Sequence, residues 1–387
     1  PEPVAARPDP FWKGLRELGS ELWLDTGDMD AAAEHWTDEF TALTTNNTLL
    51  NKEVQKGIYD DLVQAAADLL QDLDEQQRVI EIAFILNARH GLRLARRFGA
   101  RVSVELHTDL AHDVDRSVAY GRRYHAIDPQ HFIVKVPLTP AGLLAARRLS
   151  AEGVTVNFTL GFSARQNVLA ALVARPAFVN VFLGRINAYA IDNALGDGRL
   201  VGEKATLASQ RALIELAPAD GRRTRQIAAS LREGQNLIDL AGVDVFTMPT
   251  KCAAQARAEF DGNWTSRRDA DPQITWRAAT TGIRAETLYE VPDSVVFFAR
   301  ELDGIPPTDA DELVARAAEA GLQDVFPRLD PAELAQIAGD GKIPVHAHWQ
   351  DRIAAGELAI DTLLNLAGLA AFTADQAKLD DRIRATM

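Results

Sequence analysis

The chain has 387 residues, of which 47% are hydrophobic and 25% are charged, and its formal net charge is −14. These values are ordinary for a globular protein, whereas the negative charge disfavours nucleic acids and anionic membranes as partners. Cys252 is the only cysteine, which excludes an intrachain disulfide and fits a reducing compartment.

Eight short apolar runs predict buried parallel strands, because they are rich in β-branched residues. In chain order they cover residues 22–26, 41–45, 101–106, 131–137, 154–160, 178–184, 224–230 and 243–248. Helical patterns fall between them, at 52–72, 76–98, 109–126, 140–152, 164–175, 203–216 and 231–241. Strands that alternate with helices predict a parallel sheet, and eight such units predict a closed (β/α)8 TIM barrel. An open doubly wound sheet is the alternative, but no glycine-rich dinucleotide loop follows the first strand.

The pattern changes after about residue 250. Residues 261–277 have the composition of a long surface loop, and residues 308–387 are alanine-rich and helical in pattern. We therefore predict a barrel domain with an N-terminal helix over residues 1–260, and a loop with a C-terminal helical extension over 261–387 that packs on the barrel. No apolar run is long enough for a membrane span, and residues 1–10 hold no apolar signal core, so we expect a cytoplasmic protein.

The active site of a TIM barrel lies at the carboxyl ends of its strands, so polar residues late in each strand are the candidates. They are Asp25, Thr44, Thr45, Asn46, Glu105, Lys135, Asn157, Thr159, Asn180, Arg185, Ser230 and Arg232, together with the aromatic Phe182. Singly, an aspartate or asparagine there is more often a helix cap, and a strand lysine more often extends to solvent. Together, so many polar groups on one rim cost stability unless they pair with one another or with a ligand.

Lys135 is notable because it interrupts the apolar run of the fourth predicted strand. An apolar environment favours the neutral amine, which is the form that attacks a ketone and produces an imine. Imine chemistry also needs an acid that relays protons, and carbon–carbon cleavage needs a base for a substrate hydroxyl. The two carboxylates on the predicted rim, Asp25 and Glu105, are candidates for these roles.

Seven segments resemble transaldolases, in the order in which that family has them. They are LWLDTGD (22–28), TTNNTLL (44–50), VSVEL with DLAHD (102–113), IVKVPLTPAGLLAARRLSAEGVTVNFTLGFS (133–163), VFLGRI (181–186), AASLRE (228–233) and AGVDVFTMP (241–249). The 133–163 segment is the most specific of them. Two positions depart from the family: Asn47 stands where proline is usual, and Asn180 stands where many members have a serine that contacts the donor.

The resemblance implies a role for each candidate residue. Lys135 would form the Schiff base and Asp25 would be the acid/base at the C4 hydroxyl, while Glu105 and Thr159 would hold a proton-relaying water. Substrate contacts would come from the remaining candidates: Asn46 and Asn157 at the dihydroxyacetone part, with Asn180 and Phe182 nearby, and Arg185, Ser230 and Arg232 at the phosphate.

The implied reaction is that of a transferase of carbohydrate metabolism in the pentose phosphate pathway, without a cofactor or a metal. It moves a dihydroxyacetone unit from sedoheptulose 7-phosphate or fructose 6-phosphate to an aldose phosphate, so sugar phosphates are the expected partners of a monomer or homodimer. Two alternatives stay open, namely an aldolase on unphosphorylated or unusual ketoses and a barrel that binds ligands without turnover.

Three other features could carry chemistry. His346 and His348 could ligate a metal, although no third ligand of clear spacing is near them in the sequence. Glu105 and His107 would share one face of a strand, as in a metal-dependent aldolase, but Lys135 makes a metal unnecessary. Lys251, just after the eighth predicted strand, is a rival nucleophile of lower standing than Lys135, because it lies beyond the strand end.

Overall fold

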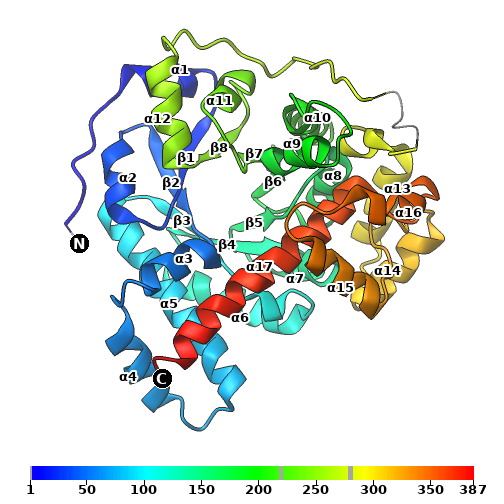
Figure 1. The fold of residues 1–387 in the computed structure, drawn as a ribbon. Helices are drawn as coiled ribbons and strands as arrows, with labels where there is room; N and C mark the ends of the chain where they lie inside the picture. Colours follow the sequence, from blue (N-terminus) through cyan, green and yellow to red (C-terminus); the bar gives the residue numbers. More distant parts are fainter. Residues whose placement is uncertain (1, 218–220, 278–281) are drawn as a thin grey trace.

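The computed structural model describes residues 2–217, 221–277 and 282–387. Eight parallel strands form a closed barrel in sequence order, with the last strand paired to the first, which confirms the predicted TIM barrel (Figure 1). The strands are β1 (Glu21–Asp25), β2 (Phe40–Thr44), β3 (Arg101–Glu105), β4 (Phe132–Pro137), β5 (Val156–Thr159), β6 (Phe178–Phe182), β7 (Arg225–Ala229) and β8 (Val245–Met248). Each lies within one residue of a run that the sequence predicts, or inside it.

Helices surround the barrel, and most match the predicted segments. They are α1 (Pro10–Glu17), α2 (Met29–His35), α3 (Asn47–Val54), α4 (Asp60–Leu69), α5 (Glu75–Phe98), η1 (Thr108–Leu110), α6 (Val114–Ile127), α7 (Pro140–Ala151), α8 (Ala164–Ala174), α9 (Leu183–Asp192), α10 (Val201–Glu215), α11 (Gln235–Asp239) and α12 (Thr250–Glu259). The prediction of one helix over 52–72 is wrong, because Gly57 adopts φ +76° and separates α3 from α4. A left-handed residue ends a right-handed helix.

The C-terminal part consists of a loop and helices, as predicted. Residues 261–277 form a loop with one isolated bridge, from Gly196 to Trp276. The helices that follow are η2 (Ala285–Leu288), α13 (Asp293–Gly304), α14 (Ala310–Glu319), α15 (Pro331–Asp340), η3 (His346–His348), α16 (Gln350–Ala354) and α17 (Ile360–Arg384). Helix α17, red in Figure 1, crosses the barrel and packs against α3, α5 and η1. None of the described helices is long and apolar enough to cross a membrane.

A buried ion cluster ties the start of α17 to the barrel helix α8. Arg165 of α8 donates from Nε and Nη2 to the two carboxylate oxygens of Asp361, both at 2.8 Å, and from Nη1 to Asp324 at 3.0 Å. Ser163 donates a further hydrogen bond to Asp361 at 2.7 Å. Burial acts to lower the pKa of Arg165, but the two carboxylates outweigh it and raise the pKa above the ordinary arginine value. The cluster therefore keeps its charges although it is buried.

The amino-terminal end of the barrel carries a second set of paired charges. Glu21, at the start of β1, pairs with Arg101 of β3 and Arg225 of β7. Burial would raise the pKa of Glu21, but Arg101 and the hydrogen bond from Trp23 lower it to about 2. The charges of Glu21, Arg101 and Arg225 are therefore paired with one another at this end of the barrel.

Replacing Asp361 tests the attachment of α17. Asp361→Ala leaves Arg165 buried with only Asp324 as a partner, so the free energy of unfolding should fall by about 3 kcal/mol, as when one partner of a buried pair is removed. Urea denaturation measures this change. Lys13→Ala is the control, because its pair with Glu17 is exposed and should leave stability unchanged. Equal stability of the two variants would show that the cluster does not hold α17.

Candidate active site

The strand register places three polar side chains side by side at the carboxyl end of the barrel. Glu105 of β3 is paired with Lys135 of β4, and Lys135 is paired with Asn157 of β5. Side chains of paired residues on neighbouring strands point to the same face. Lys135 is only 6% exposed, and its Nζ lies 3.3 Å from Glu105 Oε1. The amine that the sequence singles out is therefore buried against a carboxylate.

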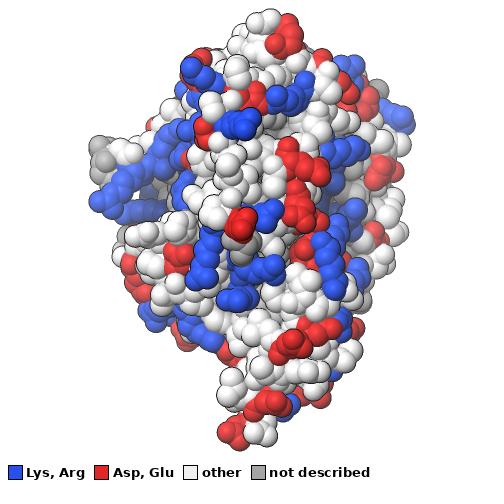
Figure 2. All heavy atoms as spheres, turned by 90° about the vertical axis from the view of Figure 1, so that its left-hand side faces the viewer, with Lys and Arg blue, Asp and Glu red and all other residues white. Residues whose placement is uncertain are grey.

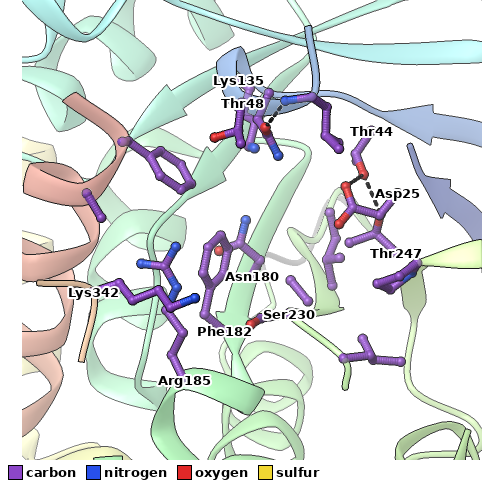
Figure 3. A pocket seen from close by; sticks show the side chains of 18 of the residues that line it. Asp25, Thr44, Thr48, Lys135, Asn180, Phe182, Arg185, Ser230, Thr247 and Lys342 are labelled. Carbon is purple, nitrogen blue, oxygen red and sulfur yellow. Dashed lines mark hydrogen bonds between the residues drawn. The ribbon is translucent and has the colours of Figure 1, made fainter. Parts of the chain in front are cut away.

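A cavity of about 270 Å³ opens over this row (Figure 3). Among its lining residues are most of the candidates that the sequence predicts, namely Asp25, Asn46, Lys135, Asn157, Asn180, Phe182, Arg185, Ser230 and Arg232. Glu105 and Thr159 are not in the lining and are almost fully buried. Glu105 Oε1 and Thr159 Oγ1 form no hydrogen bond with the protein, so both atoms are available to a water or a substrate.

Asp25 lies at the end of β1, on the side of the cavity that also carries Thr44 and Thr247 (Figure 3). Its Oδ1 accepts a hydrogen bond from Thr44 Oγ1 at 2.8 Å, and Thr44 is 2.6 Å from Thr247 Oγ1. Burial raises the pKa of Asp25 above the ordinary carboxyl value, although Lys135 and the Thr44 hydrogen bond act to lower it. Such a carboxyl is a better base than an exposed aspartate.

Arg185 and Arg232 both line the cavity, and neither forms an ion pair within the described part of the chain. The nearby carboxylates Glu233 and Asp192 therefore do not pair with either arginine. Burial and then the charge of Arg232 lower the pKa of Arg185 to about 10, and its Nη1 has no hydrogen-bond partner. Two unpaired guanidinium groups at one cavity are suited to an anionic ligand.

The chain has relatives among known proteins. It matches the model of the Transaldolase/Fructose-6-phosphate aldolase family over residues 22–291. It belongs to this family. A "Transaldolase" of Xanthomonas euvesicatoria pv. vesicatoria is 30% identical over 319 residues, which cover 77% of this chain and 96% of that protein. A "Probable transaldolase" of Thermus thermophilus is 35% identical over 233 residues, which cover 59% of this chain and 86% of that protein.

The two family departures have visible consequences in the hydrogen bonding. The backbone N–H of Asn47 donates to Glu105 Oε2 at 3.1 Å, a bond that the proline usual in the family cannot form. The side chain of Asn180 donates to Phe158 O at 2.6 Å and accepts from Gly161 N at 3.2 Å. Much of the Asn180 amide is thus engaged by backbone, although the residue lines the cavity.

The sequence reasoning missed several lining residues. They are Thr48, Leu49, Ile227, Ala229, Leu231, Thr247, Pro249, Lys342, Ala371, Phe372 and Asp375. Thr44 also lines the cavity and is one of the strand-end residues that the sequence indicates. The ring of Phe372, on α17, lies 5.5 Å from Lys135 Nζ and 5.4 Å from Arg185 Cζ. Lys342 points into the cavity on the same side as Arg185 (Figure 3). No sequence motif indicates the lining residues of the C-terminal extension, Lys342, Ala371, Phe372 and Asp375, because only the docking of the extension brings them to the barrel.

The other chemical candidates lie outside this cavity. His107 does not join Glu105 in a metal site, and its Nε2 lies 3.2 Å from Asp380 of α17. His346 contacts Tyr189 and His348 contacts Asp340, and no group of three possible metal ligands occurs among the described residues. Lys251 is exposed on α12 and does not line the cavity. Lys135 is therefore the lysine whose position fits imine chemistry within this family.

Thr44→Val tests the electrostatics around Asp25. The Thr44 hydrogen bond lowers the pKa of Asp25, so its loss should raise that pKa further. A carboxylate base must be ionised to accept a proton, so the acid limb of the kcat/KM profile should move to higher pH. Activity at acidic pH should then fall more than activity at neutral pH. Thr247→Val, which keeps the bond from Thr44 to Asp25, is the control. Coincident kcat/KM profiles of Thr44→Val and Thr247→Val would contradict the role of Asp25 as the base.

Proposed function

We propose that this protein is a transaldolase that moves a dihydroxyacetone unit between sugar phosphates through a Schiff base on Lys135. The observation that carries the proposal is the cavity itself, where a buried amine beside Glu105 meets Asp25 and two unpaired arginines. Family membership supports the same chemistry. We assign the reaction, as the sequence suggests, to the cytoplasm and the pentose phosphate pathway, with sedoheptulose 7-phosphate or fructose 6-phosphate as donor.

The first half of the reaction is imine formation. The neutral amine of Lys135 attacks the C2 carbonyl of the ketose, and the carbinolamine loses water to give the imine. Glu105 is 3.3 Å from the amine and Thr159 offers an unpartnered hydroxyl, so the two can hold a water that relays protons to the leaving hydroxide. Because Glu105 faces the amine, it can also take up the proton that the nitrogen releases after the attack.

The second half is carbon–carbon cleavage. Asp25 takes the proton of the C4 hydroxyl, the C3–C4 bond breaks, and its electrons move to the imine to give an enamine. The aldose leaves with the new carbonyl. Asn157 and Asn46 would hold the three-carbon unit on the lysine, and the buried Asn157 Oδ1 has no protein partner. Addition of the enamine to an acceptor aldose then reverses these steps.

The substrate phosphate would bind between Arg185 and Arg232, with Ser230 beside them. In the described residues these guanidinium groups have no carboxylate partner, which suits charge-assisted bonds to phosphate oxygens. Ser230 has φ +61°, a left-handed conformation that is costly for a residue with a side chain. The strained residue directly precedes the segment that carries Arg232, as is common where a backbone is shaped for binding.

An aldolase on the same ketoses is the second candidate, because the family model covers both activities. The Asn180 amide favours the aldolase activity, because its hydrogen bonds to the backbone leave fewer hydrogen bonds for the donor sugar than a free serine hydroxyl would. A coupled assay with fructose 6-phosphate, with and without erythrose 4-phosphate, separates the possibilities. Turnover only with the acceptor indicates a transaldolase, turnover without it indicates an aldolase, and none with any ketose indicates a binding protein.

The covalent step predicts where a reductive label will appear. Incubation with fructose 6-phosphate and borohydride should label Lys135 with a dihydroxyacetone-sized adduct, because reduction traps the imine that remains after cleavage. Peptide mass spectrometry locates the label. Lys135→Met should abolish labelling, whereas Lys251→Met, an exposed lysine outside the cavity, should not. A label on Lys251 in the native protein would disprove the assignment.

The two carboxylates should have separable roles. Asp25→Asn should still form an imine with dihydroxyacetone, but should lose C3–C4 cleavage by about 100-fold or more, as when a general base is removed. Glu105→Gln should instead slow imine formation itself, because the amine loses its proton partner. Single-turnover trapping measures the first step and the coupled assay measures the second. Unaltered turnover in Asp25→Asn would mean that Asp25 has only a structural role.

A further inference from the structure

The two arginines of the proposed phosphate site belong to different elements, and their like charges repel. Arg185 lies in the first turn of α9, and Arg232 lies in the loop that follows β7. The charge of Arg232 adds to burial in lowering the pKa of Arg185. Without a phosphate between them, some other interaction has to hold both elements in place.

Glu203, in the first turn of α10, contacts α9 directly and reaches the Arg232 loop through Asn236 of α11. Its Oε2 accepts a hydrogen bond from Asn187 Nδ2 of α9 at 3.0 Å, and its Oε1 accepts one from Asn236 Nδ2 of α11 at 2.7 Å. Glu203 is 2% exposed and lies outside the lining of the cavity at Lys135. Burial raises the pKa of this carboxyl, against the hydrogen bonds from Asn187 and Asn236, which act to lower it.

The amide groups of Asn187 and Asn236 cannot flip, because the Oδ1 atom of each also accepts a hydrogen bond from the backbone. Asn187 Oδ1 accepts from Gly202 N at 2.7 Å. Asn236 Oδ1 accepts from the backbone N–H groups of Arg232 at 2.9 Å and of Glu233 at 3.2 Å. Both amides must therefore present their N–H₂ group to residue 203, and only a side chain with two acceptor oxygens satisfies both.

The two elements also touch directly through Gly184, which precedes Arg185. A Cβ atom at this glycine would lie 2.2 Å from Ser230 O and 2.7 Å from Arg232 Cγ, so the contact leaves no room for a side chain. The backbone of α9 and the Arg232 loop thus meet at van der Waals distance on one side. The hydrogen bonds of Glu203 join them on the other side.

We propose that Glu203 is a positioning residue that fixes the separation of Arg185 and Arg232 and thereby sets the affinity for phosphorylated substrates. It acts through Asn187 on the helix of Arg185, and through Asn236 on the backbone of Arg232. The inference rests on the proposed phosphate site. Because Glu203 is remote from Lys135, its loss should affect phosphate binding without affecting the imine chemistry.

Glu203→Gln tests the proposal with a side chain of the same size. Glutamine has one acceptor oxygen, so its own N–H₂ group must face one of the two locked amides. The KM for fructose 6-phosphate and the inhibition constant of inorganic phosphate should rise roughly tenfold, as for the loss of one charge-assisted hydrogen bond. Aldol addition with unphosphorylated dihydroxyacetone and glyceraldehyde should keep its rate. Glu233→Gln removes a nearby exposed carboxylate and should raise neither constant.

A double variant supplies the decisive comparison. In Glu203→Gln/Asn236→Asp the introduced glutamine donates to the introduced carboxylate and still accepts from Asn187. The second oxygen of that carboxylate still accepts from the backbone N–H of Arg232. Phosphate affinity should return close to the native value, even if the single variant does not fold. A double variant no better than Glu203→Gln overturns the proposal, as does a single variant that loses activity equally on phosphorylated and unphosphorylated substrates.

Arg232→Ala separates this inference from the function on which it rests. If that variant loses affinity for phosphorylated substrates alone while Glu203→Gln does not, the phosphate site stands and the role of Glu203 is wrong. If Arg232→Ala lowers activity equally on phosphorylated and neutral substrates, the phosphate site itself fails.

Discussion

The lateral register of β3, β4 and β5 is the constraint on which the site depends. It sets Glu105, Lys135 and Asn157 in one row. The hydrogen bonds that fix this row belong to the backbone and not to the three side chains. A shift of β4 by one residue would turn Lys135 from the barrel interior to the surrounding helices. In a closed barrel such a shift is blocked from both sides, because each strand is paired to two neighbours. The strand register thus brings the amine of Lys135 beside Glu105, so their contact follows from the fold.

The same logic explains what could be predicted from the sequence. Buried parallel strands have a distinctive composition, and polar residues at their ends converge because the barrel closes, so Asp25, Lys135 and Arg232 could be grouped without a structure. Phe372 could not, since it reaches the cavity only because α17 docks through contacts such as Arg165 with Asp361. Arg165 and Asp361 are far apart in the chain, and the helical pattern of a segment does not specify which distant residue it will contact.

Charge is distributed unevenly between surface and site. The chain carries a net charge of −14, and acidic and basic side chains are interspersed over the face drawn in Figure 2. At the cavity, in contrast, the described cations Arg185, Arg232 and Lys342 have no carboxylate partner. Arg185 is half-buried, and burial together with the charge of Arg232 lowers its pKa to about 10. In the proposed complex a phosphate would offset this charge, which would link substrate binding to the stability of this rim.

Asn47 shows how a departure from a family pattern can act on the reactive pair. Its backbone N–H fixes Glu105 Oε2, and its side chain is held by Leu106 O and Asn87. With Oε2 engaged, Oε1 is the oxygen left facing Lys135 at 3.3 Å. A proline at position 47 would suit the start of α3, where no N–H is needed by the helix, but would leave the carboxylate free to rotate. The asparagine at this position therefore adds a hydrogen bond that orients the carboxylate facing Lys135.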